Sequence, residues 1–246
     1  MSRQNQLVAL ALTTAATLCC TSAAHASNDT GLEMGLRPAY GSAGSSSPVA
    51  YAPDAGVRLS GDPGRVWSKQ ASPYGGGFIG DAQLGWRPIR FLSFGMTGGI
   101  RSSSASDPGD GSTGLARSAW RIGPYVRGYI PAIAGFEPSL AIGVEYMHDA
   151  QSFKRQTSGV DADWKLTHYG VAIPMTIGLQ YRFLEFFGVG PSFQYAPVVP
   201  VAGCAAPTAP GVNFSSFCST DDGLKVSKAE SYGVWSLGLD LRVTLF

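Results

Sequence analysis

Two histidines are the only candidates for acid–base catalysis once the first 26 residues are set aside. These are His148 and His168, and a Ser-His-acid mechanism would need a serine and a carboxylate such as Asp149 in a specific geometry around one of them. Counting along the predicted strands points His148 outward and His168 inward. We therefore predict no catalytic residues and interpret both histidines as polar groups near strand ends.

No pattern in the sequence predicts a metal or nucleotide site. The only closely spaced cysteines are Cys19 and Cys20, no His-x-x-x-His occurs, and no acidic loop has a calcium-binding pattern. Asp221 and Asp222 form one acidic pair that we interpret as solvated, and the GGGFIG segment at 75–80 lacks the following helix of a phosphate-binding loop. We expect no metal and no cofactor.

Charges that alternate with apolar residues in the predicted strands are a more specific signal. A barrel of eight strands is barely wide enough for its own side chains, and a lone buried charge is costly, so inward charges of opposite sign should pair. Glu137 is also inward, whereas Arg87, Arg101 and Arg182 lie near strand ends. A gated pathway lined by the arginines is the alternative. The predicted interior charge network consists of Glu33, Arg37, Asp81, Arg121, Arg127, Glu145, Asp240 and Arg242.

Cys204 and Cys218 are the only cysteines beyond position 26. In an exported chain such a pair is expected to form a disulfide. It would close a loop of about 15 residues and stabilise the fold by about 3 kcal/mol on a chain-entropy estimate. We predict this disulfide within the last long loop.

The strands that position these residues are best defined at 231–246. Apolar side chains from Trp235 to Leu245 share one face there, and polar side chains from Ser236 to Thr244 share the other. Glycine makes up 32 of 246 residues and charged residues only 14%, which suits strands joined by turns. We predict an all-β fold of eight strands, at 32–40, 77–86, 91–101, 118–130, 136–147, 164–183, 187–198 and 231–246.

The connections between these strands alternate in length. Short links are predicted at 87–90, 131–135 and 184–186. Long stretches rich in Ser, Gly, Pro and Asp separate the other strands, at 41–76, 102–114, 148–163 and about 199–230. Membrane barrels have short periplasmic turns and long extracellular loops, with both termini in the periplasm when the strand number is even. The pattern predicts an eight-stranded antiparallel transmembrane up-and-down β-barrel.

Aromatic residues form two predicted girdles. Six lie beside the short links and six near the long loops, as expected at two membrane interfaces: Trp86, Phe91, Phe136, Tyr181, Phe183 and Phe187, then Tyr40, Trp120, Tyr146, Tyr169, Tyr195 and Trp235. A general preference of aromatics for strands is the alternative explanation. A soluble lipocalin-like barrel would have the reverse arrangement, apolar inside and wet outside, but lysines lie mainly in predicted loops rather than along strands.

Pro124 and Pro174 fall inside predicted strands, where each removes one ladder hydrogen bond. We expect β-bulges at both positions.

The N-terminus has the features of a secretory signal. Arg3 precedes the apolar run LVALALTTAATL, and Ala24-His25-Ala26 supplies a small-x-small cleavage site. We predict a cleaved signal peptide at 1–26 and a barrel at 27–246; a lipoprotein anchored at Cys19 or Cys20 is the alternative. The chain has 18 basic and 17 acidic residues, and losing Arg3 leaves it neutral, which does not favour nucleic-acid binding.

With its signal peptide, loop asymmetry, girdles and terminal aromatic Phe246, the chain resembles the small bacterial outer-membrane β-barrels grouped with the OmpA transmembrane domain and OmpW. Phe246 departs from that family by lying one residue out of phase with the apolar face. The resemblance implies location in the outer membrane, contact with its lipid and lipopolysaccharide, recognition of the terminal strand by the barrel assembly machinery, and a monomer.

Three functions are compatible with this resemblance. We expect a structural or surface-interaction protein with a plugged, ion-paired interior. A narrow OmpW-like channel for small or hydrophobic solutes is the first alternative. A lipid A-modifying enzyme is the second, although the His-x-Ser pair of the lipid A deacylase barrels is absent at both His148 and His168.

Overall fold

The computed structural model describes residues 30–43, 76–104, 112–130, 134–157, 160–184, 186–208, 217–218 and 232–245. The predicted signal peptide at 1–26 and Phe246 lie outside these residues, so the division at Ala26 stays a prediction. Within the described ranges, no helix has the length and apolar character needed to cross a membrane.

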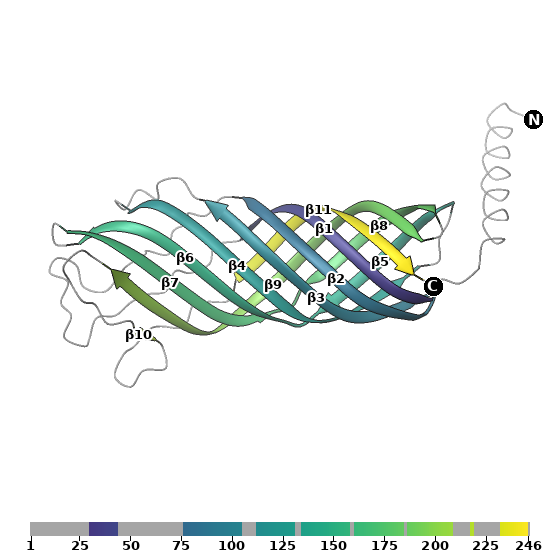
Figure 1. Ribbon diagram of the computed structural model, residues 1–246, viewed down its shortest axis with the longest axis horizontal. Coiled ribbons are helices and arrows are strands. Elements are labelled where there is room, and N and C mark those ends of the chain that lie inside the picture. The colour runs from purple at the N-terminus through teal and green to yellow at the C-terminus, as the bar shows by residue number, and fades with distance from the viewer. Residues whose placement is uncertain are drawn as a thin grey trace, which may run out of the picture.

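The strands close into one antiparallel barrel (Figure 1). The strands are β1 (Gly31–Ala43), β2 (Gly77–Ile89), β3 (Leu92–Ser104), β4 (Ser112–Tyr129), β5 (Phe136–Gly143), β6 (Glu145–Thr157), β7 (Val160–Ala172), β8 (Met175–Leu184), β9 (Phe187–Thr208), β10 (Phe217–Cys218) and β11 (Tyr232–Leu245). Short interruptions separate β5 from β6 at Val144 and β7 from β8 at 173–174, and each of these two pairs forms one strand of the wall, so the wall has eight strands. β1 pairs with both β2 and β11, which closes the sheet and confirms the predicted fold class.

Side chains alternate between the two faces of the wall along every strand of the barrel. On β11, Leu237 is 62% exposed on the outer face, whereas Asp240 is 2% exposed inside. Around the whole barrel, apolar side chains point outward and polar side chains point inward, and the outward ones form a continuous apolar belt. Such a belt is stable only against hydrocarbon. The soluble alternative with an apolar interior is therefore wrong, and the outer surface faces lipid.

Exposed aromatic side chains border this belt at both ends. Phe136 and Tyr181 pack together near the short turns, with ring centroids 5.0 Å apart. At the opposite end Trp120 packs against Tyr146 with centroids 5.5 Å apart. Amphipathic rings favour the boundary between hydrocarbon and headgroups, so the two girdles mark the limits of the membrane-spanning region.

Pro124 and Pro174 produce no bulge, contrary to our expectation. The β4–β5 and β4–β6 pairings share one register across Pro124, and the β5–β8 and β6–β7 pairings share one register across Pro174. Both prolines flank Gly143 and Val144, and their carbonyls accept the amides of these residues, at 2.9 Å from Pro174 and 3.1 Å from Pro124. Proline removes only a donor, so the ladder is interrupted locally and the inward–outward phase is preserved.

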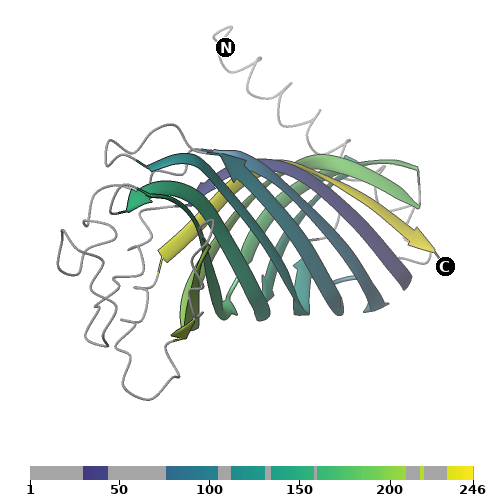
Figure 2. The same cartoon turned by 60° about the vertical axis from the view of Figure 1, so that its left-hand side comes forward.

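The predicted loop at 148–163 is wrong. β6 and β7 continue through it and leave only residues 158 and 159 between them, forming a hairpin that projects beyond the other strands (Figures 1 and 2). Its inward residues Phe153 and Trp164 are 2% and 5% exposed and stack with centroids 6.3 Å apart. The segment was taken for a loop because it is polar, but strands beyond the membrane can carry polar residues on both faces.

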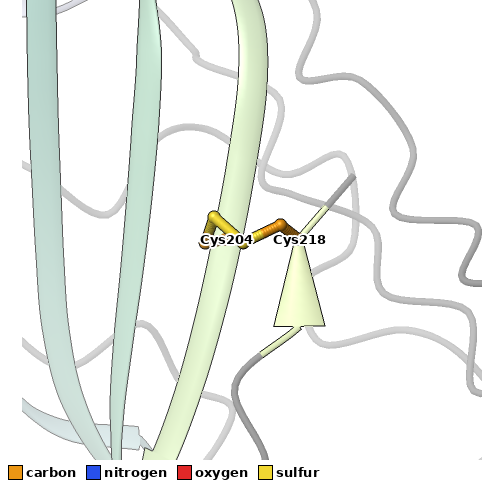
Figure 3. The surroundings of a disulfide bond; sticks show 2 residues. All are labelled: Cys204 and Cys218. Carbon is orange, nitrogen blue, oxygen red and sulfur yellow. A yellow bond between two sulfur atoms is a disulfide. The ribbon is translucent and has the colours of Figure 1, made fainter. Parts of the chain in front are cut away.

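The disulfide between Cys204 and Cys218 is present, but both cysteines lie in strands rather than in a loop (Figure 3). β9 continues to Thr208, ten residues past its predicted end at Val198. Cys204 on β9 pairs in register with Cys218 on the two-residue strand β10. The bond therefore ties β10 to the long-loop end of the barrel wall.

A charge placed on the apolar belt tests its contact with lipid. Leu239 lies at the middle of β11 and is 44% exposed on the outer face. Leu239→Arg should lower the free energy of unfolding in phospholipid by about 2–4 kcal/mol, measured by denaturant titration. Thr208→Arg, at the exposed end of β9, is the control and should change it by less than about 0.5 kcal/mol. Equal effects of the two substitutions would contradict a lipid-facing belt.

Candidate functional site

The interior of the barrel is the candidate site, because its charged side chains are gathered there. Seven of the eight residues of the predicted network are less than 5% exposed, and the side chain of Arg121 is 12% exposed. The strands place these residues on inward positions at two levels. We call the level toward the long loops the middle cluster (Arg37, Asp81, Arg121, Glu145) and the level toward the short turns the lower cluster (Glu33, Arg127, Asp240, Arg242).

Asp81 is the centre of the middle cluster. Its Oδ2 lies 2.8 Å from Arg37 Nη1 and its Oδ1 lies 2.7 Å from Arg121 Nη2. Arg121 Nε also lies 3.3 Å from Glu145 Oε2. A Cβ on Gly99 would be 2.2 Å from Asp81 Oδ1, so glycine at this position leaves the space that the ion pair occupies.

Neutral side chains of β9 and β11 bind the remaining donors of the middle cluster. Arg37 donates from Nε to Ser192 Oγ at 2.9 Å and from Nη2 to Ser236 Oγ at 2.7 Å. Arg121 Nη2, on β4, donates to Gln194 Oε1, on β9, at 2.7 Å. β4 and β9 are separated by two strands of the wall, so this hydrogen bond crosses the lumen.

The lower cluster also joins distant parts of the wall. Arg242 Nη2 lies 2.7 Å from Asp240 Oδ2, and Arg242 Nε lies 3.6 Å from Glu33 Oε1. Arg127 Nη1 approaches the same two acids, at 3.7 Å from Asp240 Oδ2 and 3.8 Å from Glu33 Oε1. Arg127 on β4 and Asp240 on β11 belong to opposite sides of the eight-stranded wall. Tyr129 donates a further hydrogen bond to Glu33.

A third group of charges lies near the short turns. Glu137 is flanked by two arginines, with Arg87 Nη2 2.8 Å from Oε1 and Arg182 Nη2 3.2 Å from Oε2. The guanidinium of Arg87 also stacks 3.8 Å from the ring centroid of Tyr129. These arginines lie near strand ends, but their side chains reach Glu137, so the ionic interior extends to the short-turn end of the barrel.

Arg117, Asp149 and Tyr232 form the loop-end cluster, which sequence reasoning missed. Arg117 Nε lies 2.9 and 2.8 Å from the two carboxylate oxygens of Asp149, and Tyr232 donates to Asp149 Oδ2 at 2.9 Å. Asp149 was placed in a loop, and Arg117 precedes the predicted start of its strand. The two-residue alternation continues inward from Arg121 to Arg117 and from Met147 to Asp149, so the signal was present in the sequence.

The two histidines lie on opposite faces of the wall. His148 is on the outer face, with its ring centroid 5.6 Å from Trp120 and 5.1 Å from Tyr169, so it belongs to the upper girdle. His168 is inside and 4% exposed, and it pairs in register with Asp149, whose carboxylate belongs to the loop-end cluster. Within the part of the chain that the structure describes, no three His, Cys, Asp or Glu side chains are grouped to hold a metal ion.

Comparison with known proteins identifies the fold. No protein-family model and no curated protein matches the chain. Among solved structures, a major outer membrane protein from Thermus thermophilus has a TM-score of 0.53 with 11% identity, over 86% of this chain and 99% of that one. The fold is therefore that of an outer-membrane β-barrel. Neisserial surface protein A has a TM-score of 0.48 with 10% identity, over 89% and 98% of the two chains. OprG from Pseudomonas aeruginosa has a TM-score of 0.48 with 13% identity, over 88% and 98%.

Removing Asp81, the acid that Arg37 and Arg121 share, tests how much the middle cluster contributes to the stability of the barrel. Asp81→Asn leaves Arg37 and Arg121 without their common partner, so we expect the free energy of unfolding to fall by about 3–5 kcal/mol, measured by denaturant titration of the folded barrel. Asp163→Asn is the matched control, because Asp163 pairs with Lys154 at 3.8 Å and both side chains are more than 65% exposed; it should cost less than about 1 kcal/mol. Losses of similar size would show that the interior pairs contribute no more than a surface pair.

Proposed function

We propose that this chain is an integral protein of the bacterial outer membrane whose barrel is plugged, and which acts through the segments at its long-loop end. The observation that carries the proposal is contact across the lumen. Arg121 with Gln194, and Arg127 with Asp240, connect strands that are not neighbours in the wall. A solute moving along the axis would have to separate these groups, and separating buried ions without replacement costs several kcal/mol.

The orientation follows from the two ends of the barrel. Leu32 and Leu245 pair at the short-turn end, which we place in the periplasm, as in other membrane barrels. The mature N-terminus expected after residue 26 and the terminal Phe246 would then both be periplasmic. Partners on this proposal are outer-membrane lipid and lipopolysaccharide around the belt, and the barrel assembly machinery at the terminal strand. We propose a monomer that needs no cofactor.

A role in surface interaction is supported by the construction of the long-loop end. The β6–β7 hairpin extends past the girdle that contains Trp120, and its interior is packed by the stacked pair Phe153 and Trp164. The Cys204–Cys218 disulfide fixes β10 beside β9 at the same end. These features hold the chain in defined positions beyond the lipid, which is useful for display and unnecessary for an inert membrane anchor.

A narrow channel for small or hydrophobic solutes is the second candidate. The observation in its favour is a small, partly open cavity in the interior, lined by Arg101, Met147 and Val198, among others, in the half of the barrel toward the long loops. The middle and lower clusters lie between this cavity and the periplasmic end. The enzyme alternative gains no support from the two histidines, since they lie on opposite faces of the wall.

Single-channel recording distinguishes plug from channel. The folded protein in planar bilayers should give no conductance steps, because the ion pairs block the axis. A sixteen-stranded porin reconstituted in the same way is the positive control, since its lumen is an aqueous channel. Discrete steps from the folded protein that vanish after heat denaturation would overturn the plug and support the channel.

A further inference from the structure

The turn between β2 and β3, at the short-turn end, is exposed and almost entirely apolar. β2 ends at Ile89 and β3 begins at Leu92, and these two residues pair across the turn, so Arg90 and Phe91 form its tip. Ile89 is 51% exposed, Phe91 is 40% exposed, and Arg90 is exposed between them. Turns that project into water usually carry Gly, Asn, Asp or Ser. This turn instead has the composition of a surface in contact with lipid, with one cation at its tip.

The surface beside the turn continues the apolar belt. Ile130, which directly follows β4, is 58% exposed. The preceding residue, Tyr129, donates from its amide to the Phe91 carbonyl at 2.8 Å, so the end of β4 is held against the turn. The short turn between β8 and β9 is apolar as well, with Leu184 and Phe186 exposed. Amphipathic and aromatic surfaces favour the boundary between hydrocarbon and headgroups, so we place the headgroups of the membrane at the level of these turns.

Arg90 is held in position at this surface, and its charge is not neutralised there. Its guanidinium carbon lies 4.4 Å from the centroid of the Phe91 ring. Inside the barrel, Arg87 donates from Nη2 to the Arg90 carbonyl and also pairs with Glu137, which fixes the backbone of the turn. Glu137 is engaged by Arg87 and Arg182. Among the residues that the structure describes, no acidic side chain forms an ion pair with Arg90.

We propose that the β2–β3 turn binds an anionic phospholipid, a diacyl lipid whose headgroup carries a phosphate and no amine. Arg90 donates hydrogen bonds to the phosphate oxygens, which suit its planar guanidinium. The acyl chains lie against Ile89, Phe91 and Ile130 and so extend the lipid contact of the belt. A zwitterionic lipid carries its own cation next to the phosphate, which competes with Arg90, so the site prefers the anionic headgroup.

The leaflet that supplies this lipid rests on the proposed function. If the short turns are periplasmic, the lipid belongs to the periplasmic leaflet. Arginine near the end of a membrane-spanning segment extends its charged group to the interface while its aliphatic part stays against apolar surface. The position of Arg90 at the tip of an apolar turn matches this behaviour.

Native mass spectrometry of the folded barrel in neutral detergent tests the site, with phosphatidylglycerol and phosphatidylcholine of identical acyl chains as the two probes. We expect one phosphatidylglycerol to be retained per barrel in preference to phosphatidylcholine. Arg90→Gln should weaken phosphatidylglycerol binding about fivefold, the loss expected for one basic residue beside an anionic lipid, and should leave phosphatidylcholine binding unchanged. Lys165→Gln removes an exposed cation on β7, toward the opposite end, and should bind phosphatidylglycerol like the parent.

Four results would overturn the proposal. They are equal retention of the two lipids by the parent, parent-like phosphatidylglycerol binding by Arg90→Gln, an equal loss in Lys165→Gln, and displacement of the lipid by excess inorganic phosphate, which has no acyl chains. Arg90→Gln should also keep the parent's change in gel mobility on boiling; loss of that change would assign the side chain to folding and equally overturn the site. The measurement involves no conductance, so its failure would leave the plugged barrel standing, and conductance steps would leave the lipid site standing.

Discussion

Closure of the sheet is the constraint on which the rest of the structure depends. A strand in hydrocarbon has no water to satisfy its amides and carbonyls, so each must pair on both sides. The pairing of β1 with β11 meets this requirement. It also shows how Pro124 and Pro174 are accommodated, since both flank Gly143 and Val144 and offer carbonyls to their amides. The interruption that these two prolines cause is thereby confined to one place in the wall.

Closure also places two incompatible environments on the two faces of one sheet. The outer face meets lipid and carries apolar side chains, whereas the inner face is too narrow for bulk water and too polar to be empty. Charges in that space lower their free energy by pairing, and side chains from opposite walls are close enough to do so, as Arg127 and Asp240 are. The ionic middle and lower clusters are thus consistent with the small number of strands.

The interior differs between the two ends of the barrel. At the short-turn end, Glu137 forms ion pairs with Arg87 and Arg182 next to the lower cluster. At the long-loop end the wall continues beyond the girdle as the β6–β7 hairpin, and the interior changes from paired charges to a cavity with mainly apolar walls. The cavity lies between two groups of charges, because Arg121 of the middle cluster and Asp149 of the loop-end cluster both line it.

The sequence by itself determined the barrel, its strand number and the direction of nearly every side chain in the membrane region, because lipid outside and charge inside impose a two-residue period. That period was visible from Trp235 to Leu245. The same reasoning failed at 148–163 and beyond Val198, where no lipid imposes an apolar face and polar strands resemble loops. Only the tertiary structure decided which charges meet: pairing between β4 and β11 or β9 depends on the register and curvature of the closed wall. For the same reason only the fold could show that Asp149 is engaged by Arg117 and that Arg101 is left facing a cavity.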